Sequence, residues 1–337
     1  MKLTLICKGG VNSGLGHLHR AVSFVENTQS FAEYTLIALV DKGLENLFRN
    51  LSNVHFVYDE ADLLKALTIV PDECRGCLLD MTELSDESCL LLRRRFDRLF
   101  SLSPLFSNYG ILDVLFTRFS DFDYPAHLRV FSGFPYAIIN THCKLISDEV
   151  YKYNLDGDSL NIGISMGGVD APNKSLHVLR ALSSLDFDCT FFVLLGEGYA
   201  HSYQEMVDTI RRDTNHEIVL AKSNRSMWKI LSNCSLAILA GGITSFEAIY
   251  AGLPCINIFE KPIHHDVLSG EVLYKKVAIN LGLFNAESLH VLNAHLKVLN
   301  ATRGKLLEMR ENSRGLLDKQ GPERTLERIR EVMAELG

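Results

Sequence analysis

Short apolar runs alternate along the chain with longer amphipathic segments. In the first half the apolar runs fall at residues 3–7, 35–40, 54–58, 77–80, 99–102 and 112–116. Segments with helical spacing lie between several of them, at 17–29, 62–67 and 87–96. Apolar runs without strict alternation are typical of parallel strands that are covered on both faces. The repeated strand–helix order therefore predicts a doubly wound α/β domain.

The second half repeats this architecture. Apolar runs recur at 160–166, 191–195, 217–220, 236–240 and 255–259, with helical segments at 175–185, 203–212, 225–233 and 245–251. Helix-forming residues dominate 287–336, and a polar stretch at 140–158 separates the two halves. We therefore predict an N-terminal Rossmann-like domain at 1–145 and a C-terminal one at 155–337 that carries the C-terminal helices.

Composition narrows the class of protein. The chain has 337 residues, 47% of them hydrophobic and 22% charged, which suits two folded domains. A formal net charge of −7 disfavours a general nucleic-acid binder, which needs a basic surface. We find no run near the ~20 apolar residues of a membrane span and no signal-peptide pattern. We expect a cytoplasmic protein with no integral membrane segment, as a monomer or a weak homo-oligomer.

Cysteine usage points to a reduced compartment. Several of the eight cysteines lie inside apolar runs, where free thiols are common. Cys74 and Cys77 have C-x-x-C spacing, but no second pair or paired histidine motif completes a zinc site. Short Asp-x-Asp triplets begin at residues 121, 156 and 186, and such triplets arise easily by chance. We expect no metal and no cofactor.

The first candidate site is the loop after the first predicted strand. It contains Gly14, Gly16, His17 and Arg20. In open α/β sheets ligands bind beyond the carboxyl ends of the strands, and glycine lets the backbone approach a ligand. A neutral imidazole at His17 can take a proton from water or a hydroxyl, and Arg20 falls on the same helix face one turn later. A tight turn with a capping histidine would use the same residues.

Two Gly-Gly turns follow corresponding strands of the second half. They are Gly167-Gly168 and Gly241-Gly242. We expect each to open a helix whose free N–H groups and positive dipole end suit a phosphate. Alternatively, the glycines of either pair only allow a tight turn to pack between a strand and a helix.

The second of these turns carries additional polar side chains. Thr244 and Ser245 add hydroxyl donors for a phosphate, and Glu247 lies at a position that suits a ribose diol. This turn is therefore the better candidate for a phosphate site.

Taken together, the motifs resemble the PseG/SpsG family, the nucleotide-sugar hydrolases of pseudaminic acid biosynthesis and the related spore-coat polysaccharide proteins. The resemblance covers most of the chain in order and spacing. It is carried by Gly14-x-Gly16-His17-x-x-Arg20, Gly167-Gly168-x-Asp170 and Gly241-Gly242-x-Thr244-x-x-Glu247-x-x-x-x-Gly252-x-Pro254.

The resemblance implies a fold and a mechanism. The family is similar in fold to MurG-type glycosyltransferases, which have two Rossmann-like domains and an interdomain cleft, the GT-B architecture. It implies a UDP-linked amino sugar whose diphosphate is held at Gly241-Gly242 and whose ribose contacts Glu247. His17 would activate water for inverting attack at the anomeric carbon, releasing UDP without a metal.

The chain departs from the family at two places. The family usually has Asp-Ser-Tyr after the fourth strand, where this chain has Asp80-Met81-Thr82. It also usually has Asn-Gln where this chain has Ile263-His264-His265-Asp266. We expect Asp80 and His265 to face the substrate, and the departures to bear on the sugar more than on the nucleotide.

Two other functions use the same residues. In an inverting glycosyltransferase His17 would deprotonate an acceptor hydroxyl instead of water. For membrane-facing transferases of this fold, the apolar stretch at 102–106 and the basic run at 93–95 are candidate surfaces. A non-catalytic nucleotide-sugar binder is the third reading, and it rests on the missing tyrosine.

Overall fold

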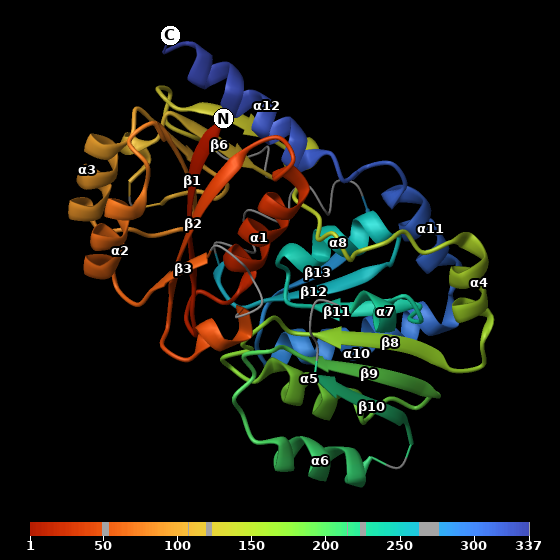
Figure 1. Ribbon diagram of the computed structural model, residues 1–337. Coiled ribbons are helices and arrows are strands. Elements are labelled where there is room, and N and C mark those ends of the chain that lie inside the picture. The colour runs from red at the N-terminus through yellow and green to blue at the C-terminus, as the bar shows by residue number, and fades with distance from the viewer. Residues whose placement is uncertain are drawn as a thin grey trace. The chain divides into compact units, whose positions relative to one another are not determined.

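A computed structural model describes residues 1–48, 54–106, 108–118, 123–213, 215–222, 227–262 and 276–336 (Figure 1). The chain forms two compact units, each built around its own parallel sheet. Unit 1 comprises Met1–Thr141 together with the C-terminal stretch from Asp318. Unit 2 comprises His142–Leu317. The predicted pair of doubly wound α/β domains is confirmed.

Unit 1 contains a seven-stranded sheet in the order β3-β2-β1-β4-β5-β6-β7, with every neighbouring pair parallel. The strands are β1 (Lys2–Gly9), β2 (Glu33–Val40), β3 (Val54–Val57), β4 (Gly76–Asp80), β5 (Arg98–Ser101), β6 (Val114–Thr117) and β7 (Arg129–Ser132). β4 is buried along its whole length, as expected of a central strand covered on both faces.

Helices α1 (Gly16–Thr28), α2 (Glu60–Ala66), α3 (Asp86–Arg95) and α12 (Gly321–Ala334) belong to unit 1. Two of these helices have an N-cap side chain that accepts a backbone hydrogen bond. Asp59 accepts a hydrogen bond from the backbone N–H of Asp62 at the start of α2, and Ser85 accepts one from Ser88 at the start of α3. These caps satisfy N–H groups that a helix leaves without internal partners.

The last helix lies in unit 1, so the predicted C-terminal domain of 155–337 is wrong for its final part. Lys319 Nζ donates to the carbonyl of Thr141 at 2.9 Å, and a Cβ on Gly321 would lie 2.0 Å from the carbonyl oxygen of Ala137. α12 also contacts α1. An amphipathic helix shows from its spacing which face is apolar, but not which sheet that face covers.

Unit 2 contains a six-stranded parallel sheet in the order β10-β9-β8-β11-β12-β13. Its strands are β8 (Leu160–Ser165), β9 (Cys189–Leu195), β10 (Glu217–Lys222), β11 (Leu236–Leu239), β12 (Cys255–Phe259) and β13 (Ala278–Leu283). Its described helices are α4 (Asp148–Asp156), α5 (Lys174–Leu182), α6 (Tyr203–Arg212), α7 (Trp228–Leu231), α8 (Ile243–Ala251), α10 (Ala286–Ala301) and α11 (Gly304–Ser313).

Three elements lie where none was predicted. The edge strand β7 is exposed at both ends and carries no clear apolar run. β13 mixes polar and apolar residues, and α4 lies inside the predicted linker. Ser147 caps α4, and Tyr151 and Leu155 bury its inner face, so tertiary packing stabilises a helix whose sequence reads as polar.

In both sheets the strand order reverses next to the first strand, between β1 and β4 in unit 1 and between β8 and β11 in unit 2. At such a point neighbouring loops leave the sheet in opposite directions and open a crevice at the carboxyl ends of the strands. Most of the predicted site residues follow these four strands.

Candidate active site

His17 is the second residue of α1, directly after the loop that follows β1. That loop turns sharply: the backbone N–H of Gly10 donates to the carbonyl of Gly14 at 3.0 Å, and Gly14 has φ +72°. Glycine adopts this left-handed conformation without the steric cost that other residues have. The turn brings the start of α1 over the carboxyl end of the sheet, with the His17 side chain 17% exposed.

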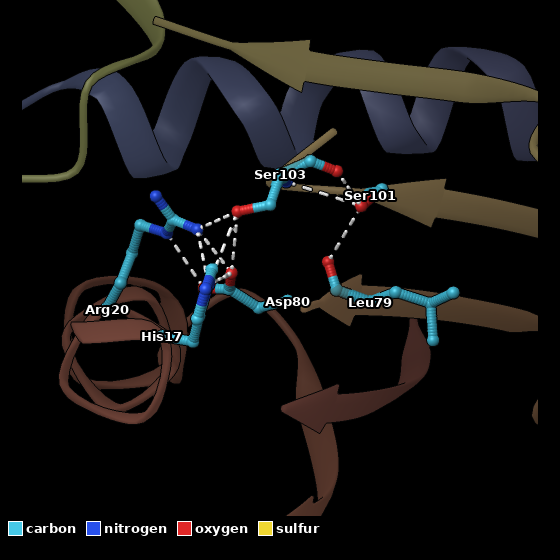
Figure 2. Close-up of polar contacts among 6 residues, drawn as sticks. All are labelled: His17, Arg20, Leu79, Asp80, Ser101 and Ser103. Atoms are coloured by element: carbon cyan, nitrogen blue, oxygen red, sulfur yellow. Dashed lines mark hydrogen bonds and ion pairs between the residues drawn. The ribbon is translucent and has the colours of Figure 1, made fainter. Parts of the chain in front are cut away.

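Asp80 ends β4, the strand next to β1, and its side chain is fully buried. Its carboxylate accepts hydrogen bonds from three neighbours, which Figure 2 shows converging on it. His17 Nδ1 lies 2.8 Å from Oδ1, and Arg20 Nε lies 2.8 Å from Oδ2. Arg20 Nη2 and the hydroxyl of Ser103 also donate to Oδ1. Three of these four donors point at Oδ1 and one points at Oδ2, so both oxygens of the carboxylate accept hydrogen bonds.

The electrostatics of Asp80 follow from these partners. Burial by itself raises the pKa of Asp80, but the charge of Arg20, the neighbouring His17 and the hydrogen bonds from both outweigh it. They hold the pKa well below its usual range, so the carboxylate is ionised at neutral pH.

An ionised Asp80 fixes the tautomer of His17. Arg20 Nη2 and Ser103 Oγ also lie near Nδ1, at 3.1 and 3.3 Å. A guanidinium only donates, so Arg20 cannot accept the proton of Nδ1. The carboxylate only accepts, so the 2.8 Å contact requires a proton on Nδ1 of His17. The lone pair of the neutral ring is then on Nε2, which is the arrangement that a general base needs.

Ser103 belongs to this cluster, and we had not predicted it. It follows β5, the neighbour of β4, and its hydroxyl accepts from Arg20 Nη2. The hydroxyl of Ser101 donates to the carbonyl of Ser103 at 2.5 Å, which holds this turn against the sheet. The sequence could have indicated Ser103 through its position just after the carboxyl end of a strand. Instead, we included Ser103 in the apolar stretch at 102–106.

Asp80 and Arg20 lie deeper than we expected. We predicted that both contact the substrate, but Asp80 is 0% exposed and Arg20 only 3%. Arg20 Nε and Nη2 are directed at the carboxylate of Asp80, and both side chains are buried beside His17. Met81 is also fully buried in the apolar core, so it does not face a ligand.

In unit 2, the first Gly-Gly turn does not open a helix with free N–H groups. Gly167 has φ +98°, and α5 begins only at Lys174. The carboxylate of Asp170 accepts the backbone N–H groups of Lys174 and Ser175 at 2.8 and 2.9 Å. This cap occupies the helix end, so the expectation of a phosphate site at that helix start is corrected.

The second Gly-Gly turn does open a helix. Gly241 has φ +72°, and Gly242 immediately precedes α8. Because Gly242 has no side chain, the first N–H groups of α8 have no cap from that position, and a Cβ built there meets no atom within 4 Å. Gly241 packs against the ring of Phe259 at the end of β12. The turn therefore presents open backbone at the positive end of a helix dipole, which suits an anion.

Two polar side chains of α8 have partners inside unit 2. Ser245 is fully buried, and its hydroxyl donates to Asn257 Oδ1 at 2.6 Å, so this hydroxyl is not free for a phosphate. Asn257 in turn donates to Asn280 Oδ1 at 2.9 Å. Thr244 is only partly buried, and its hydroxyl as a phosphate donor stays a prediction.

Glu247 is 5% exposed, and its Oε2 accepts a hydrogen bond from the indole of Trp228 at 3.1 Å. The contact links the start of α7 to the second turn of α8. His265, also predicted to face the substrate, lies outside the described residues.

Within the described ranges of the chain, no helix has both the length and the apolarity to cross a membrane. In the same ranges, His, Cys, Asp and Glu side chains form no group of three or more that could hold a metal ion.

Comparisons with known proteins place these features in context. No protein-family model matches the chain. It is 24% identical over 281 residues to the uncharacterized protein MJ1062 of Methanocaldococcus jannaschii, covering 79% of this chain and 57% of that protein. It is 23% identical over 194 residues to the spore coat polysaccharide biosynthesis protein SpsG of Bacillus subtilis, covering 57% and 56%. The chain thus spans little more than half the length of these relatives.

Solved structures match over almost the whole chain. MurG of Acinetobacter baumannii has a TM-score of 0.69 at 18% identity, covering 98% of this chain and all of that one. S. aureus MnaA in complex with UDP has a TM-score of 0.64 at 10% identity, covering 99% and 97%. At these identities the likeness shows the fold, which is GT-B with two Rossmann-like domains.

Proposed function

We propose that this chain hydrolyses a UDP-linked amino sugar to UDP and free sugar, in the synthesis of a surface glycan or of a pseudaminic-type acid. The observation that carries the proposal is the His17–Asp80 contact, supported by Arg20. A buried, ionised carboxylate that receives the Nδ1 proton leaves Nε2 of His17 as a proton acceptor.

In the proposed reaction, a water oxygen forms a bond to the anomeric carbon of the sugar. The bond from that carbon to the phosphate oxygen breaks, and its electron pair leaves with UDP. The proton of the attacking water passes to Nε2 of His17. Asp80 stabilises the imidazolium that forms, and Arg20 and Ser103 hold Asp80 in place. Attack from the face opposite UDP inverts the configuration.

Unit 2 supplies the nucleotide-binding residues in this proposal. The diphosphate binds the backbone of Gly241 and Gly242 and the first N–H groups of α8, with the Thr244 hydroxyl as a further donor. Glu247, oriented by the indole of Trp228, accepts a ribose hydroxyl. At the end of the neighbouring strand β8, only Gly167 offers open backbone, because a Cβ there would meet no atom within 4 Å.

The comparisons support a nucleotide sugar as the substrate class. One fold neighbour was solved with UDP, and Anabaena HepE was solved with UDP and glucose. SpsG is named for polysaccharide biosynthesis. The motifs at His17 and Gly241 resemble those of the PseG/SpsG family, and this resemblance supports hydrolysis as the reaction.

A glycosyltransferase is the second candidate, because the same proton acceptor serves an acceptor hydroxyl. The whole-chain likeness to MurG favours it. The two candidates differ in whether the sugar is released without an acceptor.

The test is nucleotide release from UDP-, GDP- and CMP-sugars with no acceptor present. We expect UDP release by the wild type and a loss of about 100-fold or more in His17→Ala, the range typical of a general base. His290→Ala, an exposed histidine on α10, is the matched control and should match the wild type. Tight UDP binding without release would exclude the hydrolase and favour the transferase, and absence of UDP binding would exclude both.

A further inference from the structure

Unit 2 contains a buried lysine whose side chain has no part in the site described above. Lys174 is the first residue of α5, and its side chain is only 2% exposed. Lysine is almost never fully buried without a charged partner. Nζ of Lys174 lies 3.5 Å from Oε2 of Glu260, the one ion-pair partner that it has among the described residues.

This ion pair is loose. Its 3.5 Å separation exceeds the 2.7–3.2 Å of an ordinary N–H···O hydrogen bond. The Glu260 side chain is 42% exposed, so its carboxylate remains in contact with water. The ammonium of Lys174 has three N–H donors. One weak contact with Glu260 leaves donors that can bind a stronger acceptor.

The strand order places this pair beside the Gly241–Gly242 turn. Lys174 begins α5, the helix that follows β8, and Glu260 directly follows β12. β11 lies between these two strands, and the turn is the segment that follows β11. Phe259, the neighbour of Glu260, packs directly against Gly241. The Lys174–Glu260 contact therefore crosses the carboxyl edge of the sheet where the turn leaves it.

We propose that Lys174 is the cation that binds the diphosphate of the nucleotide, exchanging Glu260 for a phosphate oxygen when the ligand arrives. The inference rests on the proposed nucleotide site at Gly241–Gly242. In the unliganded protein Glu260 neutralises a buried charge that would otherwise be costly. A diphosphate offers more negative charge and several acceptor oxygens, and Glu260 can turn to water because it is already part-exposed.

A purely structural role would have a different signature. If the pair only ties the loop after β8 to the end of β12, its loss lowers stability without regard to the ligand. If Lys174 binds the diphosphate, its loss weakens ligands in proportion to their phosphate charge. Uridine, UMP and UDP separate these outcomes, since they share the nucleoside and differ in phosphate.

The experiment is calorimetric titration of wild type, Lys174→Met and Lys297→Met with uridine, UMP and UDP. Lys297 is the matched control, an exposed lysine of the same unit paired with Asp186. We expect Lys174→Met to bind UDP about 10- to 100-fold more weakly, the range of a lost charge-assisted hydrogen bond, with uridine unchanged. UDP affinity equal to wild type, or equal losses for UDP and uridine, would overturn the proposal.

A second variant covers the case in which Lys174→Met does not fold. Glu260→Gln removes the competing carboxylate and leaves the ammonium in place, so we expect it to bind UDP more tightly than the wild type. Unchanged or weaker UDP binding in Glu260→Gln would contradict the exchange. A wild-type protein that does not bind UDP at all would instead refute the proposed function itself.

Discussion

Nδ1 of His17, at the start of α1, lies 2.8 Å from Oδ1 of Asp80, at the end of β4. The two residues are 63 positions apart in the chain and meet because β1 and β4 are neighbours in the sheet. The contact joins a part-exposed imidazole to a carboxylate without access to water, so Asp80 orients His17 and is itself shielded from a substrate.

The first prediction concerns the tautomer of His17. In Asp80→Asn one carboxylate oxygen is replaced by an NH2 group, which donates hydrogen bonds and does not accept them. The tautomer of His17 with its proton on Nε2 then competes with the tautomer that has it on Nδ1. We expect kcat for UDP-sugar turnover to fall about 100-fold or more while UDP affinity stays within about twofold, because the nucleotide is proposed to bind unit 2. Rapid-quench turnover and UDP titration measure the two quantities, and a loss confined to UDP affinity would contradict the orienting role.

The second prediction concerns stability and pH. The pKa of Asp80 is lower in the folded chain than in the unfolded one, so the ionised form stabilises the fold above the ordinary carboxyl pKa of about 3.9. That contribution is lost as pH falls below this value toward the folded pKa. At pH 7 Asp80→Asn should lose about 3–5 kcal/mol, because the buried charge of Arg20 is left uncompensated.

The difference in unfolding free energy between wild type and Asp80→Asn should therefore be constant between about pH 5 and 7 and shrink below about pH 4. Urea unfolding followed by circular dichroism at stepped pH measures it. Taking the difference removes the contributions of other acidic groups, which are common to both proteins. A gap that widens on acidification would mean that Asp80 is protonated in the native state.

The third prediction compares the two glycines before α8. An alanine at Gly241 would need φ +72° and would place its Cβ 2.2 Å from the ring of Phe259, so Gly241→Ala should be markedly destabilised. Gly242→Ala should fold normally, because a Cβ there meets no atom within 4 Å.

Gly242→Ala should nevertheless bind UDP more weakly than wild type, since the added methyl group stands where the phosphate is proposed to approach the backbone. Thermal melting and UDP titration of both variants check these expectations. Wild-type UDP affinity in a folded Gly242→Ala protein would place the diphosphate elsewhere.

The fourth prediction concerns ribose recognition by Glu247. If its carboxylate accepts a ribose hydroxyl, the wild type should bind UDP more tightly than 2′,3′-dideoxy-UDP, and Glu247→Gln should lose most of that preference. Trp228→Phe removes the indole hydrogen bond that orients Glu247 and should reduce the preference less. Competition binding with the two nucleotides measures the ratio, and an unchanged ratio in Glu247→Gln would assign Glu247 a structural role only.

Much of the architecture could be predicted from sequence, because it depends on local signals. Apolar runs such as 77–80 and 255–259 lie at strands within one residue of the prediction, since a strand buried on both faces must be apolar throughout. His17 and Gly241 were found because a strand followed by glycines and a helix has a recognisable pattern. β7 and α4 were missed because their stability comes from tertiary neighbours and not from their own sequence.

The sequence by itself determined which residue types stand at the carboxyl ends of the strands: a histidine and an arginine after β1, an aspartate ending β4, and glycines after β11. Only the tertiary structure decided what they do. It buried Asp80 behind His17, brought Ser103 to Arg20, turned the Ser245 hydroxyl toward Asn257 and placed α12 in unit 1. The physical reason is that propensity and hydrophobic spacing act within a few residues. Hydrogen bonding and burial depend on which strands become neighbours, and that order is set by the whole sheet.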